Sequence, residues 1–413
     1  MSWAQFGHTV FDLVVKANRR GASYSAGTLD VGASAAFVRD VEDQLARVNQ
    51  VIESGVRKVL REKFQKKLSY TSLTMPVTMK DIARDLGIGV ITVSKVLRNK
   101  DDVSEKTRQR VLARVKEVNY TPNLAARSLV TGRTYLVGLV VPDLLHTFFA
   151  QIANSLSKAL LKKGYGLVIS TAGEDTELEM HTLDRFLARR FDALIIASGA
   201  TSSTTLARLL EAGTPFVLID RRFPDIEANY VGVDDEVVGA FATEHLIEIG
   251  CSRIAHLRGP ETSPGRGRLN GYLSAMAEHK MKSFPGYVSA PKLADVHSRE
   301  SGEEQMKKLL DLRQRPNGVF AYNDSMAIGA IHAVLDAGLR VPEDVAVIGC
   351  GNLHYDNELR VPLSSIDQDT EQIGERAARL TLSLLESKSR PRPKTVIIET
   401  QLVIRASTDR KRR

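Results

Sequence analysis

The sequence TMKDIARDLGIGVITVSKVL, residues 78–97, determines how the rest of the chain is interpreted. Thr78 can accept a hydrogen bond at the start of a helix, and Asp81, three residues later, gives the spacing of a capping box. The turn Gly87-Ile88-Gly89 interrupts the helical pattern, because glycine tolerates the positive φ that a tight turn requires. A second apolar helical pattern follows at residues 90–97. The sequence therefore predicts a helix-turn-helix, which places the start of its second helix in the major groove of DNA.

The predicted second helix has one face available for DNA. Val93 and Val96 fall on its inner side at helical spacing, so the opposite side chains point outward. Val90 and Ile91 can contact thymine methyl groups, and Lys95 can donate to guanine or to phosphate.

Positive charge is concentrated around this unit. Residues 75–134 hold twelve Lys and Arg against six Asp and Glu, whereas the whole chain has a net charge of +8. A third helix is predicted to begin after Ser104, and its outer face carries Lys106, Arg108, Arg110, Arg114 and Lys116. A solvated charged face is the alternative, but this density of positive charge on a small unit favours phosphate binding.

This stretch resembles the LacI/GalR-type bacterial repressor family. The resemblance rests on motifs at residues 78–83, 92–97, 103–108 and 119–123, which have the order and spacing of that family. It implies that the following side chains contact DNA: Thr78, Val90, Ile91, Thr92, Ser94 and Lys95. Gly89 departs from the family's usual Ser at the start of the second helix, but glycine is tolerated at a helix N-cap.

A short hinge helix is expected next. Pro122 ends the third helix and Asn123 can cap a new one. By the resemblance, two hinge helices from two subunits lie in the minor groove, Leu129 is wedged into the central base step, Ala126 faces its counterpart and Arg127 lies near the DNA backbone. Unstacking a base step costs about a few kcal/mol, which the contacts of bent DNA offset. The alternative is that Leu129 only packs in a linker.

The composition is that of a globular protein with a nucleic-acid partner. The chain has 413 residues, is 43% hydrophobic and has a pI near 9.3. No apolar run is long enough to span a membrane, and the start of the chain lacks a secretory pattern. Cys251 and Cys350 form no CxxC motif, so a disulfide framework is not expected. These features indicate a cytoplasmic protein.

The first 74 residues are an N-terminal extension that the resemblance does not cover. Residues 16–35 are rich in Gly, Ser and Ala, and residues 38–59 have a short heptad-like seam interrupted by Gly55. A short amphipathic helix is expected there rather than a true coiled coil. Met75 resembles the usual beginning of a family member, so we expect translation to start there, which mass spectrometry of the native N-terminus would test.

From residue 135 to residue 413 apolar runs alternate with helical patterns. Such alternation predicts an α/β fold with parallel sheets, here two doubly wound subdomains with a ligand cleft between them. The predicted strands are Leu136–Val141, Leu167–Ser170, Ala193–Ala197, Phe216–Ile219, Ile254–Leu257, Val319–Ala321 and Val345–Gly349. Helical patterns lie between them, for example at Ile152–Lys163, Val237–Ile249, Met326–Ala337 and Ile373–Glu386. This part is slightly acidic, which gives it no evident reason to bind DNA.

The resemblance continues through this part and implies the fold of periplasmic sugar-binding proteins, used as a dimeric sensor. By position, the effector cleft would be lined by Asp143, Phe148, Phe149, Asp220, Arg221, Arg268 and Asn323. An aromatic platform with forked donors and acceptors suits a sugar, a sugar phosphate or another polar metabolite. Phe148 and Phe149 could equally belong to the core, and Arg268 is the strongest single candidate.

Two departures from the family concern this cleft. Gly351 stands where the family has a sugar-gripping carboxylate, and His146-Thr147 replaces the common Asn-Pro. Both departures argue against an ordinary monosaccharide as the effector. They are compatible with a phosphorylated or acidic effector, or with no effector.

An enzyme is the less favoured interpretation. Residues 265–271 contain glycines at a spacing that does not fit the dinucleotide fingerprint, and no P-loop, zinc-site spacing or nucleophile elbow occurs. No cofactor or metal is expected. A solute-binding protein without DNA regulation is the alternative, but it would need an export signal and would not carry a helix-turn-helix.

The sequence thus predicts a ligand-responsive, DNA-binding transcriptional regulator. Its expected parts are the extension 1–74, a helix-turn-helix domain 75–121, a hinge and linker 122–134, and an effector-binding and dimerisation domain 135–413. We expect a homodimeric repressor that binds a palindromic double-stranded operator.

Overall fold

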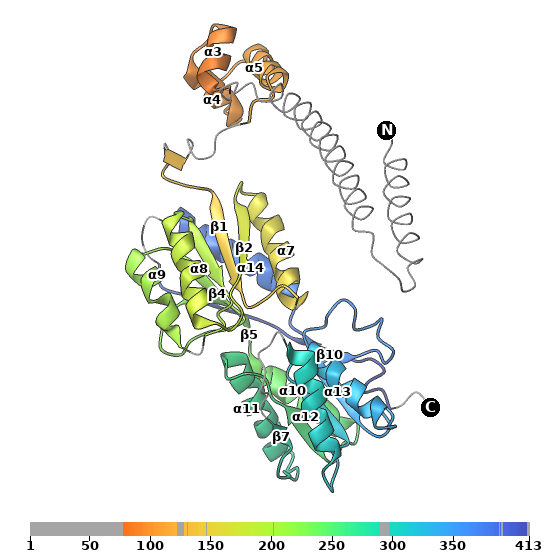
Figure 1. The fold of residues 1–413 in the computed structure, drawn as a ribbon. Coiled ribbons are helices and arrows are strands. Elements are labelled where there is room, and N and C mark those ends of the chain that lie inside the picture. The colour runs from red at the N-terminus through yellow and green to blue at the C-terminus, as the bar shows by residue number, and fades with distance from the viewer. Residues whose placement is uncertain are drawn as a thin grey trace, which may run out of the picture. The chain divides into compact units, whose positions relative to one another are not determined.

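The computed structural model describes residues 77–121, 128–129, 131–145, 147–200, 202–289, 297–387, 389 and 391–410. The chain divides into two compact units, Met1–Pro122 and Asn123–Arg413 (Figure 1). The heptad-like seam at 38–59 and the expected translation start at Met75 lie outside the described residues.

Three helices make up the described part of the first unit: α3 (Met79–Leu86), α4 (Val90–Leu97) and α5 (Glu105–Glu117). The predicted capping box is present, because Thr78 Oγ1 accepts from the backbone of Asp81 and the Asp81 carboxylate accepts from the backbone of Thr78. Gly87 ends α3 with a φ of 64°, which explains why glycine stands there. The turn between α3 and α4 is therefore encoded locally.

A small apolar core holds these three helices together. Its buried members are Ile82, Ala83, Val93, Val96 and Val111. Ser104 caps α5 by accepting from the backbone of Thr107. Leu112 also falls at helical spacing with Val111 and Val115, which predicts an inward position, but it is 48% exposed and lies outside this core.

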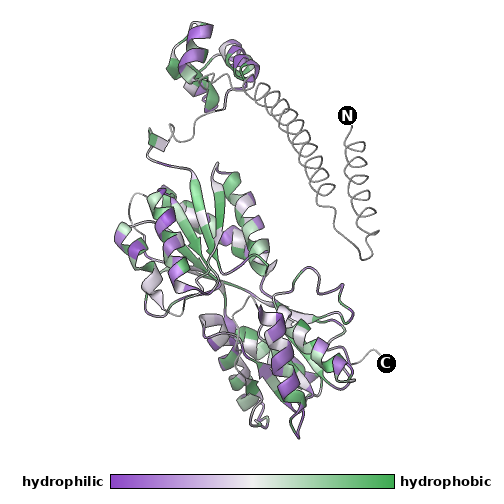
Figure 2. Cartoon of the chain, viewed as in Figure 1, coloured by the Kyte–Doolittle hydropathy of each residue, from purple (hydrophilic) through white to green (hydrophobic). Residues whose placement is uncertain are grey.

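The second unit begins with a parallel six-stranded sheet in the order β11-β5-β4-β3-β1-β2. Its strands are β1 (Leu136–Val141), β2 (Gly166–Thr171), β3 (Ala193–Ile196), β4 (Phe216–Ile219), β5 (Asn229–Val233) and β11 (Thr395–Ile398). The helices that accompany it are α7 (Thr147–Leu161), α8 (Thr176–Ala188), the 3-10 turn η1 (Ser203–Leu206), α9 (Ala207–Ala212) and α14 (Thr370–Glu386). This sheet and its helices form the first subdomain. Figure 2 shows hydrophobic residues concentrated on its strands.

The second subdomain repeats this plan with the strand order β12-β10-β9-β8-β6-β7. Its strands are β6 (Ile254–Leu257), β7 (Val288–Ser289), β8 (Gly318–Ala321), β9 (Ala346–Cys350), β10 (Ser364–Asp367) and β12 (Gln401–Val403). Only β12 is antiparallel to its neighbour among the pairs of the two described sheets. Its helices are α10 (Asp235–Glu248), α11 (Ser263–Glu278), α12 (Ser298–Leu310) and α13 (Asp324–Asp336).

The chain passes between the two subdomains three times: from β5 to α10, from β10 to α14, and from β11 to β12. These crossings turn the carboxyl ends of strands from both sheets toward one cleft, which is where parallel α/β sheets bind ligands. The predicted fold class of two doubly wound subdomains is therefore confirmed. Within the described part of the chain, no helix is both long enough and apolar enough to cross a bilayer.

Candidate nucleic-acid interface and effector cleft

The outer face of α4 exposes the apolar side chains that the sequence assigned to base contacts. Ile91 is 71% exposed and Val90 is 37% exposed, whereas Val93 and Val96 are buried in the three-helix core. Thr92, Ser94 and Lys95 are partly exposed. The exposed Ile91 side chain buries little apolar surface and so contributes little to the stability of the fold. It is therefore available to contact a partner.

Lys95 is held by an ion pair within the first unit. Its ammonium donates to the carboxylate of Asp102, in the loop before α5, and this contact lowers the pKa of Asp102. Lys95 must leave this carboxylate to reach a base or a phosphate.

All three arginines of α5 bind other groups of the protein rather than projecting freely. Arg108 donates to Asn99 Oδ1, Arg110 donates to the carbonyl oxygen of Leu86, and Arg114 bridges Asp85 and Glu117. The interpretation of the whole basic face as a phosphate-binding surface was therefore too broad. In the described part of the first unit, the exposed lysines that make no ion pair with another described residue are Lys80, Lys100, Lys106 and Lys116.

The predicted hinge falls mostly outside the described residues, including Asn123, Ala126 and Arg127. Leu129 is described and is 88% exposed. The assignment of Leu129 to the minor groove stays a prediction.

Eight residues line a small pocket between the two subdomains, which we call the cleft pocket. They are Phe148, Phe149, Asp220, Arg268, Tyr322, Asn323, Cys350 and Gln368. Five of these were predicted from sequence, and they come from the start of α7, the end of β4, α11 and the end of β8. The volume is only about 20 Å³, so this arrangement leaves no room for a monosaccharide.

The two phenylalanines both fill the core and border the cleft pocket. Phe148 and Phe149 are 4% and 3% exposed, and their rings meet edge to face with centroids 5.2 Å apart. Phe148 and Phe149 are therefore core residues that also line the cleft pocket.

Arg268 is the most heavily engaged polar group of the cleft pocket. Its guanidinium donates to Asp235 Oδ1 at 3.1 Å, to the carbonyl oxygen of Tyr322 at 2.7 Å and to Gln368 Oε1 at 3.1 Å. It also lies over the Tyr322 ring, 4.7 Å from the centroid. Burial acts to lower the pKa of Arg268, but nearby acidic groups, Cys350 and Asp235 among them, raise it overall, so this side chain is a fixed buried cation.

Two predicted cleft residues are buried but are not among the lining residues. Arg221 is 2% exposed and donates to the carbonyl oxygen of Ser198. Asp143 is also buried, after the end of β1. Asp220, next to Arg221, has a φ of 60°, a left-handed conformation that Asp tolerates better than most residues.

Asn323 has a structural role at the start of α13. Its Oδ1 accepts from the backbone of Met326 and its Nδ2 donates to Ser298. An effector would have to compete with these bonds for the amide.

Sequence reasoning missed Tyr322, Cys350 and Gln368. Tyr322 follows β8, Cys350 ends β9 and Gln368 follows β10. The rule that ligands meet the carboxyl ends of parallel strands could have indicated all three.

The structure explains why position 351, where the family has a carboxylate, holds a glycine in this chain. Gly351 has a φ of 136°, and a Cβ there would approach Asp324 Oδ2 at 2.9 Å. The next residue, Asn352, is engaged by Asp367 and Arg405. Among the described residues no group of acidic, His or Cys side chains is arranged to hold a metal ion.

Family models match both functional parts of the chain. Residues 78–123 match the model described as bacterial regulatory proteins, lacI family, and residues 243–408 match a periplasmic binding protein-like domain. The chain is 30% identical over 338 residues to the HTH-type transcriptional regulator DegA of Bacillus subtilis (strain 168), covering 81% of this chain and 98% of that protein. This chain belongs to the LacI family.

Other LacI-family members support the same assignment. The chain is 32% identical over 336 residues to the HTH-type transcriptional repressor PurR of Haemophilus influenzae (strain PittEE), covering 80% of this chain and 98% of that one. Its fold is similar to that of the Lac repressor dimer bound to operator and the anti-inducer ONPF, with a TM-score of 0.71, 26% identity and coverage of 81% and 99%. It is also similar to a transcriptional regulator CelR–cellobiose complex, with a TM-score of 0.61, 31% identity and coverage of 80% and 99%. The relatives are transcriptional regulators, not enzymes, and this LacI-family chain is a DNA-binding transcriptional regulator.

Proposed function

We propose that this chain binds a palindromic operator as a homodimer, acts as a repressor, and changes its DNA affinity when a small polar effector enters the cleft between its subdomains. The observation that carries the proposal is the combination in one chain of the exposed α4 face and the two-subdomain sensor. The Lac repressor dimer, bound to operator, supports the dimeric arrangement.

Base contacts are assigned to the start of α4. Val90 and Ile91 offer exposed apolar surface suited to thymine methyl groups, and Lys95 reaches DNA once it separates from Asp102. Thr78, Thr92 and Ser94 supply hydroxyl groups for phosphate or base contacts.

The hinge is assigned to the minor groove. A leucine that is 88% exposed, Leu129, suits a wedge between base pairs, with Asn123, Ala126 and Arg127 around it as the resemblance implies.

Effector recognition is assigned to the cleft, around Arg268. Asp220, Phe148, Phe149 and Asn323 border it directly, and Asp143 and Arg221 lie at the ends of the adjoining strands. Because the cleft pocket measures only about 20 Å³, an effector must part the two subdomains or displace the phenylalanines. A regulatory response requires a coupling free energy of about 1–3 kcal/mol between effector and DNA binding.

A selection of bound duplexes from a random DNA pool tests the operator part of this proposal. The full chain should enrich a palindrome, and its mass in solution, from sedimentation, should be that of a dimer. Enrichment of a non-palindromic site by a monomer would contradict it.

Two variants separate the DNA and effector functions. Leu129→Ser should weaken operator binding by about tenfold or more, since it removes the wedge that offsets unstacking, and should leave ligand binding unchanged. Arg268→Gln should abolish the effector response and spare DNA binding. Leu112→Ala is the control for exposed apolar surface, because it shortens an exposed leucine outside α4 and the hinge.

The alternative, a solute-binding protein without DNA regulation, predicts a different result. Such a protein would bind its ligand but would enrich no duplex, and Ile91→Ala would change nothing measurable.

A further inference from the structure

The two ends of the sheet in the first subdomain differ in charge. The segments that lead into β1, β2, β3, β4 and β11 are residues 131–135, 162–165, 189–192, 213–215 and 387–394. In the sequence they hold nine Lys and Arg against one Asp. The segments that lead from β1, β2 and β3 to the next helix, 142–146, 172–175 and 197–202, hold three acidic residues and no Lys or Arg. The slightly acidic composition of the whole sensor unit conceals this segregation.

The parallel topology brings the basic segments to one end of the sheet. The register aligns Val137 of β1 with Leu167 of β2 and with Ala193 of β3, so these three strands begin side by side (Figure 1). Arg133, just before β1, donates to the carbonyl oxygen of Leu385, which places the last turn of α14 at the same end. Neighbouring strands lie about 4.8 Å apart, so a six-stranded sheet spans about 24 Å, the length of about seven base pairs of DNA.

Four basic side chains at this end are exposed and lie in two adjacent segments. They are Lys162 and Lys163, between α7 and β2, and Arg189 and Arg190, between α8 and β3. Within the described part of the second unit, none of the four forms an ion pair. We call these four side chains the basic rim. Their charges are therefore available to an anionic partner.

The single acidic residue of these segments is directed at the backbone. The carboxylate of Asp192 accepts from the backbone N–H groups of Thr134 and Tyr135 and from the hydroxyl group of Thr134. Arg133, next to them, donates to the hydroxyl group of Tyr165 and adds a further positive charge at the start of β1. One carboxylate thus stands against the basic rim and Arg133.

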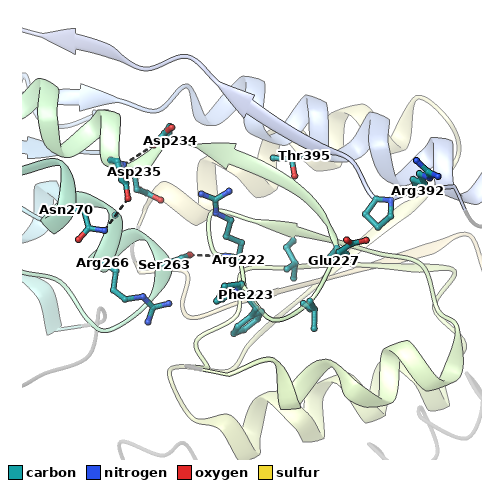
Figure 3. A pocket seen from close by; sticks show the side chains of 17 residues that line it. Arg222, Phe223, Glu227, Asp234, Asp235, Ser263, Arg266, Asn270, Arg392 and Thr395 are labelled. Carbon is teal, nitrogen blue, oxygen red and sulfur yellow. Dashed lines mark hydrogen bonds between the residues drawn. The ribbon is translucent and has the colours of Figure 1, made fainter. Parts of the chain in front are cut away.

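The far edge of the sheet is less suited to an anion. Arg392 precedes β11 and lines a cavity of about 1040 Å³ together with Glu227 (Figure 3). Three further carboxylates line the same cavity, those of Asp234, Asp235 and Glu236. These negative charges oppose the approach of a phosphate, so we do not include Arg392 in the basic rim.

Attraction to helix dipoles explains only part of this pattern. Basic residues favour helix C-termini, where the partial charge is negative. In the second subdomain the segments that follow α10, α11, α12 and α13 hold six Lys and Arg against three Asp and Glu, at residues 249–253, 279–287, 311–317 and 337–345. Some of those are engaged, since Arg253 donates to the carbonyl oxygen of Arg315 and Arg340 pairs with Asp344. The excess of positive charge in the first subdomain is larger.

We propose that the basic rim binds the phosphate backbone of duplex DNA. Each phosphate that Lys or Arg neutralises releases counterions, which gives affinity without base recognition. DNA is the polyanion favoured here because the chain is a DNA-binding regulator, and because residues 131–135, which lead from the hinge segment into the sensor, lie at this end of the sheet. The inference goes beyond the proposed function, in which the sensor unit responds to an effector and pairs with a second copy but does not contact DNA.

Fluorescence anisotropy with the full chain and a labelled duplex of arbitrary sequence, over a series of salt concentrations, tests the proposal. One double variant is Lys162→Gln with Lys163→Gln, and the other is Arg189→Gln with Arg190→Gln. Each should weaken binding by about threefold to tenfold. Each should also make the slope of log affinity against log salt shallower by about one to two units, because phosphate contacts are lost.

Lys280→Gln with Arg313→Gln is the matched control. Both residues are exposed and follow helices in the second subdomain, and their replacement removes the same two charges. Lys280 has a φ of 52° and Arg190 a φ of 54°, so glutamine meets the same backbone conformation in both variants. Arg189→Lys with Arg190→Lys keeps the charge and should retain wild-type affinity within about twofold.

Three results would overturn the proposal. The first is equal affinity and salt slope in the rim variants and the control. The second is weaker binding with an unchanged salt slope, which would show that no phosphate contact was lost. The third is an equal loss in the lysine and glutamine variants at positions 189 and 190, which would show that charge is not responsible. Binding to an arbitrary duplex requires neither a palindrome nor an effector, so a failed operator selection would produce none of these results.

Discussion

Asp324 and Asp356 bring two carboxyl groups together inside the second subdomain. Both side chains are fully buried. Asp324 Oδ1 accepts from Ser365 and its Oδ2 accepts from the backbone of Leu353, so Asp324 is stabilised as the charged partner. Burial and the neighbouring Asp324 raise the pKa of Asp356 to about 9, so Asp356 is the protonated partner at neutral pH.

Asp356→Asn should stabilise the protein increasingly as pH rises from about 4 to about 9. The folded pKa of Asp356 lies above its ordinary value of 3.8, so folding retains a proton that the unfolded chain releases, and wild-type stability falls through this window. Asparagine has no proton to lose and can donate to Asp324. Thermal melts at pH 5 and pH 8.5 measure the difference between variant and wild type.

The control for this prediction is Asp324→Asn. It removes an acceptor from Ser365 and Leu353 and should destabilise the protein at both pH values. An Asp356→Asn melting temperature that is lower than wild type at pH 8.5 would contradict the assignment.

The ion pair between Lys95 and Asp102 restrains a side chain expected to contact DNA. Asp102→Asn should release Lys95, raise affinity for a non-specific duplex and steepen the dependence of log affinity on log salt by about one unit. Fluorescence anisotropy over a salt series gives both quantities.

Asp101→Asn is the matched control, because it changes the net charge equally at a neighbouring exposed acid. Equal effects of the two variants would show that net charge, and not release of Lys95, is responsible.

At the scale of elements, glycines allow neighbouring helices of the second subdomain to approach closely. A Cβ at Gly271 in α11 would lie 1.9 Å from the carbonyl oxygen of Glu236 in α10, and one at Gly239 would lie 2.1 Å from that of Arg268. Gly302 and Gly329 create the same close contact between α12 and α13. Backbone atoms cannot move aside as a side-chain terminus can, so these glycines fix the spacing of each helix pair.

Gly271→Ala should destabilise the sensor unit by about 1–3 kcal/mol, the usual cost of overpacking, despite alanine's better helix propensity. Chemical denaturation measures this loss. Ser274→Ala, an exposed position on the same helix, should be nearly neutral. A stability for Gly271→Ala equal to that of Ser274→Ala would contradict the close approach of α10 and α11.

Some strands and helices could be predicted from the sequence pattern and others could not, for physical reasons. All seven predicted strands correspond to strands of the structure, because buried parallel strands are short apolar runs. The strands that were not predicted include β5, which contains Gly232, and β7, which has only two residues. Helices were expected between the strands, but the apolar periodicity of α11 and α12 is weak because glycines such as Gly271 and Gly302 occupy their packed faces.

At the scale of the whole molecule, the chain divides into two compact units with separate cores. In the described part of the first unit, five buried apolar residues form the core. The second contains both sheets and all the larger core clusters of the described residues.

Thermal unfolding of the full chain should therefore show two transitions. Ile82→Ala, which opens a cavity in the three-helix core, should lower only the transition of the first unit, by about 2–5 kcal/mol of unfolding free energy. Gly271→Ala should lower only the other transition. Scanning calorimetry resolves the two, and a single transition shifted by both variants would show that the units fold as one.

The sequence by itself determined the local features of this protein. The capping box at Thr78, the glycine turn at Gly87 and the apolar strands each depend on residues close together in the chain, so their patterns are readable without a fold. The family motifs likewise lie in short contiguous segments, and they assigned the chain correctly.

Only the tertiary structure decided which side chains are available. Lys95 pairs with Asp102 in the loop before α5, and Arg110 and Arg114 contact α3. The cleft pocket is likewise lined by residues from several separate elements. A larger cavity of the second unit likewise assembles residues from positions 218 to 395. Such contacts depend on how elements pack, and no local pattern of residue types records that packing.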